Sequence, residues 1–127
     1  MTRRSERVAE AIRRLASEII RDELKDPRIK EMITVTKVEI TPDLRYAKIY
    51  YSVLGDDKKR ELVARGLKSA KSYIRRRIAD ELKLRYAPDI ALRVDERIEH
   101  SKRVDKILDI LHKEVEDERN EKGSRGA

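Results

Sequence analysis

Two short runs rich in β-branched residues place the strongest constraint on the fold of this chain. The first run, residues 33–40, predicts a strand, but its apolar alternation changes phase between Val35 and Val38, which indicates a β-bulge. Residues 41–44 are typical of a turn, and residues 46–53 then alternate polar and apolar side chains. The two runs together predict a β-hairpin with one buried face.

The segment before this hairpin has the periodicity of a helix. Its apolar residues recur at the 4-3-4 spacing of one helix face, at Val8, Ile12, Leu15 and Ile19. We expect Ser5 to be the N-cap of this helix. We expect Lys25-Asp26-Pro27 to end it, because proline disfavours helical geometry in the residue before it.

The segment after the hairpin predicts further helices and a third strand. Residues 58–83 carry a continuous apolar stripe that fits one long helix or two helices joined at a break, best placed at Ala70-Lys71-Ser72. Residues 90–94 alternate like a strand, and apolar residues from about Ile98 to Val115 predict the last helix. Residues 116–127 are polar and are expected to form a disordered tail.

These elements predict an α+β domain over residues 1–115, with a small three-stranded sheet packed against helices in the order α-β-β-α-α-β-α. The core is expected to be aliphatic, because the chain has five tyrosines and no Phe or Trp. The absence of cysteine excludes a disulfide scaffold and fits a reducing compartment. No apolar run approaches the roughly 18–20 residues of a membrane span. We therefore expect a cytoplasmic protein without membrane contact. We also expect a monomer.

Catalysis and metal binding have little support in the sequence. His100 and His112 lie 12 positions apart, which places them about 120° from each other on a helix. Asp105 and Asp109 share a helix face, but basic neighbours can pair with both. No glycine-rich phosphate loop occurs. We therefore predict no catalytic residues, no metal, no cofactor and no small-molecule substrate.

The distribution of charge is the most informative functional feature. The chain has a net charge of +7, and residues 65–85 hold +6 of it, with eight basic side chains and two acidic ones. Arginine suits phosphate because its planar guanidinium can donate two hydrogen bonds to one anion. This local excess predicts nucleic-acid contacts by these basic residues, with the first three arginines of the chain's first helix as a secondary cluster: Lys68, Lys71, Arg75, Arg76, Arg77, Lys83 and Arg85; Arg3, Arg4 and Arg7.

Other interpretations of these residues remain open. A basic segment is often a solvated helix face balanced by neighbouring acids, and it can also serve a protein–protein adaptor that binds an acidic partner. Tyr46 and Tyr50 share the non-core side of the second predicted strand with Lys48, where they can stack on bases or simply support the strand.

Several stretches resemble the ribosome-binding factor A family, and together they span about residues 4–115. They are Arg7-Val8-Ala9-Glu10, Lys25-Asp26-Pro27-Arg28-Ile29, Thr34-Val35-Thr36-Lys37-Val38-Glu39, Asp43-Leu44-Arg45-Tyr46-Ala47-Lys48-Ile49-Tyr50, Ala70-Lys71-Ser72-Tyr73-Ile74-Arg75 and Leu82-Lys83-Leu84-Arg85-Tyr86-Ala87-Pro88-Asp89. The resemblance rests on their order and spacing more than on any single stretch.

This resemblance implies a type II KH-like fold in which an Ala-x-Gly kink replaces the usual Gly-x-x-Gly loop. The matching positions here are Ala70 and Ser72, so serine stands where the family has glycine. The resemblance also implies binding to free 30S ribosomal subunits through 16S rRNA and assistance in their late maturation. That role includes processing of the 5′ end of 16S rRNA and a contribution to cold adaptation.

Overall fold

A computed structural model of the chain describes residues 3–29 and 33–125; the side chains of residues 99, 101–102 and 120–125 are not described. The chain divides into two units, Met1–Asp95 and Glu96–Ala127, which are treated separately below. Helices and strands follow the order α1, η1, η2, β1, β2, α2, β3 and α3. The α+β class is confirmed.

The first helix, α1 (Arg3–Glu18), begins earlier and ends earlier than its sequence pattern predicts. Ser5 is a buried residue inside α1, so the prediction that it is the N-cap is wrong. The chain then widens into a π-helical turn, η1 (Ile19–Glu23), which keeps Ile19 and Ile20 buried. A short 3-10 helix, η2 (Pro27–Ile29), follows. The Asp26 carboxylate accepts a hydrogen bond from the Arg28 backbone N–H at 2.9 Å and thereby supports the turn.

The predicted hairpin is confirmed as β1 (Ile33–Ile40) and β2 (Tyr46–Val53), which pair antiparallel. The register shifts between Val35 and Lys37, so the predicted bulge is also confirmed. The third strand, β3 (Asp89–Val94), pairs parallel to β2 on its other side, and the sheet has the order β1-β2-β3. A parallel pair needs a crossover connection, and here α2 supplies it.

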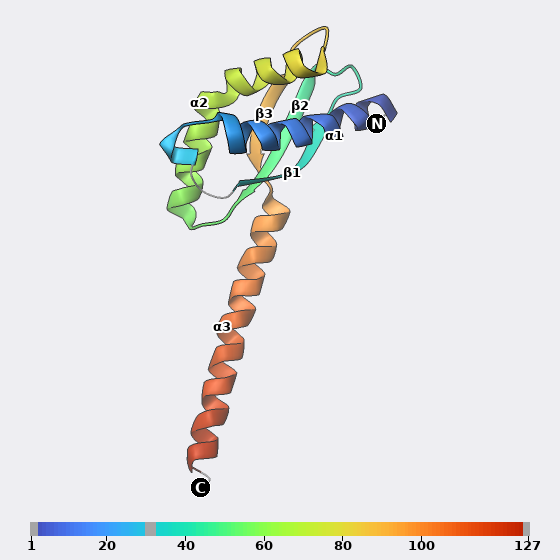
Figure 1. The fold of residues 1–127 in the computed structure, drawn as a ribbon. Helices are drawn as coiled ribbons and strands as arrows, with labels where there is room; N and C mark the ends of the chain where they lie inside the picture. Colours follow the sequence, from blue (N-terminus) through green and yellow to red (C-terminus); the bar gives the residue numbers. More distant parts are fainter. Residues whose placement is uncertain (1–2, 30–32, 126–127) are drawn as a thin grey trace. The chain divides into compact units, whose positions relative to one another are not determined.

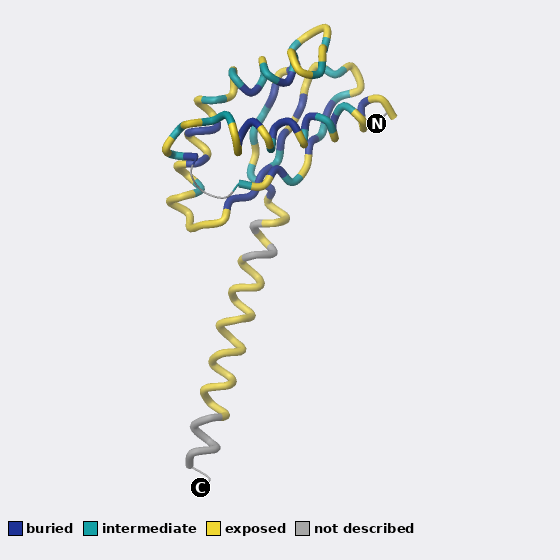
Figure 2. Tube along the Cα trace, viewed as in Figure 1, coloured by how far each residue is buried: buried dark blue, intermediate teal, exposed yellow. Residues whose placement is uncertain are grey.

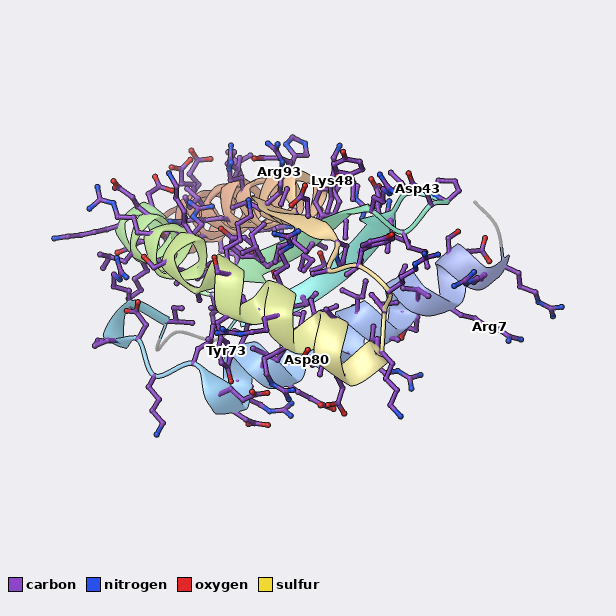
Figure 3. All side chains as sticks on the ribbon, turned by 90° about the horizontal axis from the view of Figure 1, so that it is seen from above. Arg7, Asp43, Lys48, Tyr73, Asp80 and Arg93 are labelled. Atoms are coloured by element: carbon purple, nitrogen blue, oxygen red, sulfur yellow. The ribbon has the colours of Figure 1, made fainter. Side chains whose placement is uncertain are left out.

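Both α1 and α2 cover the same face of this sheet, and the opposite face of the sheet in this unit is left without a helix (Figures 1 and 3). The residues buried between the helices and the sheet form an aliphatic core, as predicted, together with Tyr51; Figure 2 shows them in dark blue. The largest fully buried side chains include Ile12, Ile49, Leu67, Ile74 and Ile78. Polar side chains on the uncovered face therefore remain available for contacts outside the unit.

The segment predicted as one helix or two is a single unbroken helix, α2 (Asp57–Leu82). The separate fourth and fifth elements of the predicted order are therefore merged into one. Figure 1 shows that this helix bends partway along its length, between its green first half and its yellow second half. Asp56 is the N-cap, and its carboxylate accepts a hydrogen bond from the Lys59 backbone N–H at 2.9 Å. Lys83 ends the helix in the left-handed conformation, with φ of 51°.

The second unit contains one helix, α3 (Glu96–Arg125), which runs past the end predicted for it. Residues 116–125 continue this helix, whereas the sequence predicts a disordered tail; residues 126–127 lie outside the described residues. The apolar residues that predict this helix are exposed in the part of α3 whose side chains are described, for example at Ile107 (57%) and Leu111 (50%) (Figure 2). Among the described residues, no helix combines the length and the apolar character needed to cross a membrane.

Candidate nucleic-acid interface

A hollow with a basic lining lies between α2 and β3. Its volume is about 350 Å³, and its charged lining residues are Lys68, Lys71 and Arg93. No ion pair with a carboxylate is found for these three cations within the part of the chain that the structure describes, and none of the lining residues is acidic. We call this hollow with its three cations the basic groove.

Helix and strand geometry bring these three side chains together. Lys68 and Lys71 are three positions apart and share one side of α2, while Leu67 and Ile74 are buried against the sheet. On β3, Ile90 is buried in the core and Arg93 is exposed. Figure 3 shows Arg93 together with Lys48 on the side of the sheet opposite to α1. The groove thus depends on the parallel pairing of β2 and β3, which places β3 beside the crossover helix.

The sequence predicts Lys68 and Lys71 as contact residues but misses Arg93. Arg93 lies outside the basic segment, and the residues next to it in the sequence do not indicate that it contacts nucleic acid. Two sequence features taken together would have indicated Arg93 as a contact residue. It is on the polar side of a predicted strand, and that strand directly follows the basic helix. In the fold, this strand lies beside the basic helix, so Arg93 shares one surface with Lys68 and Lys71.

Arg75 faces the loop that leads into β3 instead of solvent alone. Its guanidinium donates hydrogen bonds from Nε to the Pro88 carbonyl and from Nη2 to the Ala87 carbonyl, both at 3.0 Å. The same guanidinium forms an ion pair with Asp89 at 3.2 Å. Arg75 therefore fastens the end of α2 to the start of β3.

Arg77 is likewise occupied by other parts of the protein. Its Nε donates a hydrogen bond to Oε1 of Glu23 at 2.8 Å, and Glu81 lies 3.6 Å away on the next turn of the helix. Tyr73 donates its hydroxyl proton to the same Glu23 oxygen at 2.5 Å. The Arg77 guanidinium, and then the Tyr73 hydroxyl, lower the pKa of Glu23, and the carboxylate in turn raises the pKa values of Arg77 and Tyr73. This cluster joins η1 to α2.

The other predicted contact residues are exposed and spread over the unit. Three of them lie near or just after the end of α2: Arg76, Lys83 and Arg85. They are exposed, and no ion pair is found for them in the described regions. The secondary cluster is exposed at the start of α1: Arg3, Arg4 and Arg7. Figure 3 shows Arg7 near the start of α1, far from Arg93 and the groove. The structure therefore does not bring all predicted residues into one patch.

The kink positions Ala70 and Ser72 both lie inside α2, where the backbone remains helical. Ser72 is exposed and Ala70 is partly buried. One turn earlier, Gly66 packs so closely against η2 that a Cβ atom built on it would lie 2.6 Å from Cγ1 of Ile29. This contact fixes the first half of α2 against η2 and so positions Lys68.

No group of three or more potential ligands is placed to hold a metal ion in residues 3–29 and 33–125, within the side chains described there. His100 and His112 are exposed residues of α3. Among the described residues, the exposed cations of the basic groove offer the binding of anions.

Comparison with known proteins gives a consistent set of relatives. The family model described as ribosome-binding factor A matches residues 4–108. The ribosome-binding factor A of Geobacter sulfurreducens is 48% identical over 124 residues, which cover 98% of each chain. A Thermotoga maritima protein, a candidate ribosome-binding factor A solved by NMR, is 35% identical with a TM-score of 0.63, over 71% of this chain and 85% of that one.

A Thermus thermophilus ribosome-binding factor A, fitted as a homology model into a cryo-EM map of its 30S complex, shares the fold. It is 21% identical with a TM-score of 0.53, over 65% of this chain and 86% of that one.

Proposed function

The chain belongs to the ribosome-binding factor A family, and we propose that it is a non-enzymatic assembly factor that binds the small (30S) ribosomal subunit through 16S rRNA. The observation that carries this proposal is the basic groove, in which Lys68, Lys71 and Arg93 converge without an acidic residue in the lining. Cations on a fixed scaffold bind phosphates and supply affinity and position, while the shape of the folded RNA supplies specificity.

The proposed mechanism is thermodynamic. A factor that binds one arrangement of the rRNA more tightly than another shifts the equilibrium toward the first by the difference in affinity. In this way the protein assists late maturation of the free subunit, including processing of the 5′ end of 16S rRNA, and it matters most in the cold, where misfolded RNA rearranges slowly. We place it in the cytoplasm as a monomer, on the family resemblance.

The structure narrows the residues proposed to contact RNA. Lys68 and Lys71, joined by Arg93, form the primary contact, and the exposed cations beyond them extend it: Arg76, Lys83 and Arg85, with Arg3, Arg4 and Arg7 as a secondary cluster. We propose that Arg75 and Arg77 stabilise the packing of α2 against its neighbours instead of contacting RNA, because their guanidinium groups already bind protein oxygens.

The test is cosedimentation with purified 30S subunits over a series of salt concentrations. Each phosphate contact contributes about 0.7–0.9 to the slope of log affinity against log salt. The triple variant Lys68/Lys71/Arg93→Gln should therefore reduce that slope by about 2–3 and weaken binding at every salt concentration. An unchanged slope would overturn the groove as the RNA contact.

A matched control removes three positive charges elsewhere. Arg13, Arg14 and Arg21 are paired with Glu10 or Asp22 on the first helical segment, so their replacement by Gln should leave the slope nearly unchanged. Equal losses in both triple variants would mean that net charge alone drives binding. An adaptor for an acidic protein predicts instead that the complex survives nuclease treatment, and that result would refute RNA binding.

A further inference from the structure

Two exposed tyrosines lie at one end of the sheet, away from the basic groove's cations. Tyr46 begins β2, and Tyr86 lies in the loop between α2 and β3; each exposes 58% of its surface. Tyrosine rings of this size usually gain stability from burial, so rings left this open in the compact unit contribute little to its core. Together with the adjacent Arg45 and Arg85 they form what we call the sheet-end cluster.

The two arginines of this cluster are held by the ring of Tyr86. The guanidinium carbon lies 5.6 Å from the ring centroid for Arg45 and 5.4 Å for Arg85, within the range of cation–π attraction. No ion pair joins either guanidinium to a carboxylate in residues 3–29 and 33–125. Asp43, the nearest acid along the chain, accepts hydrogen bonds from the Thr41 hydroxyl and the Arg45 backbone N–H.

Hydrogen bonds from backbone and side-chain groups order the two loops of the cluster. The Asp89 N–H donates a hydrogen bond to the Arg45 carbonyl at 2.8 Å, which links the start of β3 to the hairpin turn. Arg75 binds the Ala87 and Pro88 carbonyls from the other side. The Thr41 hydroxyl oxygen accepts a hydrogen bond from the Tyr46 N–H at 3.1 Å. A site that is already ordered loses less conformational freedom when a ligand binds.

A hollow of about 390 Å³ lies beside Tyr46, lined also by Thr41, Pro42 and Lys48. Its size falls within the roughly 300–1,000 Å³ of small-ligand clefts. The one acid in its lining, Glu39, forms an ion pair with Lys37 at 2.9 Å and also lies opposite Lys48 in the β1–β2 pairing, where the two charges attract each other. Figure 3 shows Lys48 on the sheet face that α1 and α2 leave uncovered. The hollow therefore has an aromatic wall and, with two lysines and one glutamate in its lining, a net charge of +1.

We propose that the sheet-end cluster binds an unpaired nucleotide of the RNA. The base enters the hollow and stacks on Tyr46, while the guanidinium groups of Arg45 and Arg85 contact the flanking phosphates. Tyr86 is a positioning residue, because its ring orients both guanidinium groups. Unpaired RNA bases are commonly recognised by such stacking, which is tolerant of sequence. This inference rests on the proposed binding of rRNA and adds a single-stranded segment to what the protein recognises.

The test uses the full chain and a single-stranded RNA probe of about ten nucleotides that carries a fluorescent adenine analogue. Tyr46→Ala should weaken binding of this probe by about 5- to 100-fold and abolish the fluorescence quenching caused by stacking. Tyr46→Phe keeps the ring and should bind within about 2-fold of the unchanged chain. Because stacking releases few counterions, the salt slope should be the same for Tyr46→Ala and the unchanged chain.

Three results would overturn the stacking site. They are an unchanged affinity in Tyr46→Ala, an equal loss in Tyr46→Phe, and equal competition for the site by an oligoglutamate peptide, which would indicate an acidic protein partner. The groove variant Lys68/Lys71/Arg93→Gln separates this inference from the proposed function. If that variant loses 30S binding while Tyr46→Ala binds the probe normally, the stacking site alone fails. If the groove variant also leaves 30S binding unchanged, the groove fails as the RNA contact; if the unchanged chain does not bind 30S subunits, the proposed function fails too.

Discussion

Replacing Gly66 by alanine probes the contact that positions the first half of α2. The new Cβ would lie 2.6 Å from Cγ1 and 3.0 Å from Cδ1 of Ile29, whereas carbon atoms pack best at about 3.5–4.0 Å. Ile29 must therefore shift by about 1 Å, and overpacking of this kind typically costs about 1–3 kcal/mol. Alanine in a helix gains about 1 kcal/mol over glycine. The net expectation is a loss of about 0–2 kcal/mol in the free energy of unfolding.

In a variant that already carries Ile29→Ala, we expect Gly66→Ala to stabilise the fold instead of destabilising it. Ile29→Ala removes both atoms of the close contact and costs about 2–5 kcal/mol by itself, because the side chain is 8% exposed and part of the core. Adding Gly66→Ala to that variant should stabilise it by up to about 1 kcal/mol, since the helix preference then outweighs the milder remaining contact with Cβ of Arg28 at 3.3 Å. The two sites should therefore show a coupling energy of about 1–3 kcal/mol.

Urea unfolding followed by circular dichroism measures all four proteins of this cycle. The urea concentration at the midpoint of unfolding should change, while the slope of the free energy of unfolding against urea concentration stays constant. A constant slope keeps the comparison within two-state behaviour. If Gly66→Ala has the same effect with Ile29 as without it, the close contact does not limit the packing of α2 on η2, and the reasoning fails.

The structure supports two further predictions about charged residues of α2. Arg75→Ala should lower the free energy of unfolding by about 1–3 kcal/mol, because it removes two charged hydrogen bonds, whereas the exposed Arg76→Ala should change it by less than about 0.5 kcal/mol; equal effects in urea unfolding would contradict the assignment. Arg77 lowers the pKa of Glu23, so that carboxylate stabilises the fold above its ordinary pKa and loses this contribution as the pH falls through the lowered value. The difference in stability between the unchanged chain and Glu23→Gln should therefore be constant near neutral pH and shrink in acid, and a pH-independent difference would argue against the ion pair.

Features that depend on neighbouring residues were predictable from the sequence. The phase change after Val35 exposes the bulge, because side chains alternate strictly along a strand and an extra residue is visible as a slip. The bounds of β1 and β2 match the predicted runs, residues 33–40 and 46–53, because strand alternation is equally local. The resemblance to ribosome-binding factor A also rests on local stretches, and the family match confirms it.

Features that depend on distant partners were not predictable in the same way. Nothing in the basic segment distinguishes Arg77 from Arg76, yet Arg77 binds Glu23, which lies 54 positions earlier. Arg75 binds the loop 12 and 13 positions later, so it too is removed from the set of available cations. Arg93 enters the groove only because β3 pairs parallel to β2. The periodicity of the sequence predicts which side chains share one face of a helix or strand. It does not predict which other element packs against that face.

The helices show the same limit at their ends. The proline at position 27 predicts the end of a helix, but α1 already ends at Glu18 and the chain continues as the π-helical turn η1, with Ile19 and Ile20 buried. In α3 the apolar spacing correctly predicts a helix, yet the described apolar side chains of that helix, such as Val104 (40%) and Leu108 (49%), are exposed. A pattern of spacing indicates a helix without establishing what covers it.

The parallel pairing of β2 and β3 also bears on the order in which the surface is assembled. The β1–β2 hairpin closes through a short turn, whereas Tyr46 meets Asp89 only after all of α2 has returned along the sheet. Closing the longer loop costs more chain entropy, so the hairpin is favoured to form first and β3 to join later. Among the described strands, β3 is also an edge strand, paired with β2 on one side alone. Occupancy of the groove between α2 and β3 therefore reports that folding of the unit is complete.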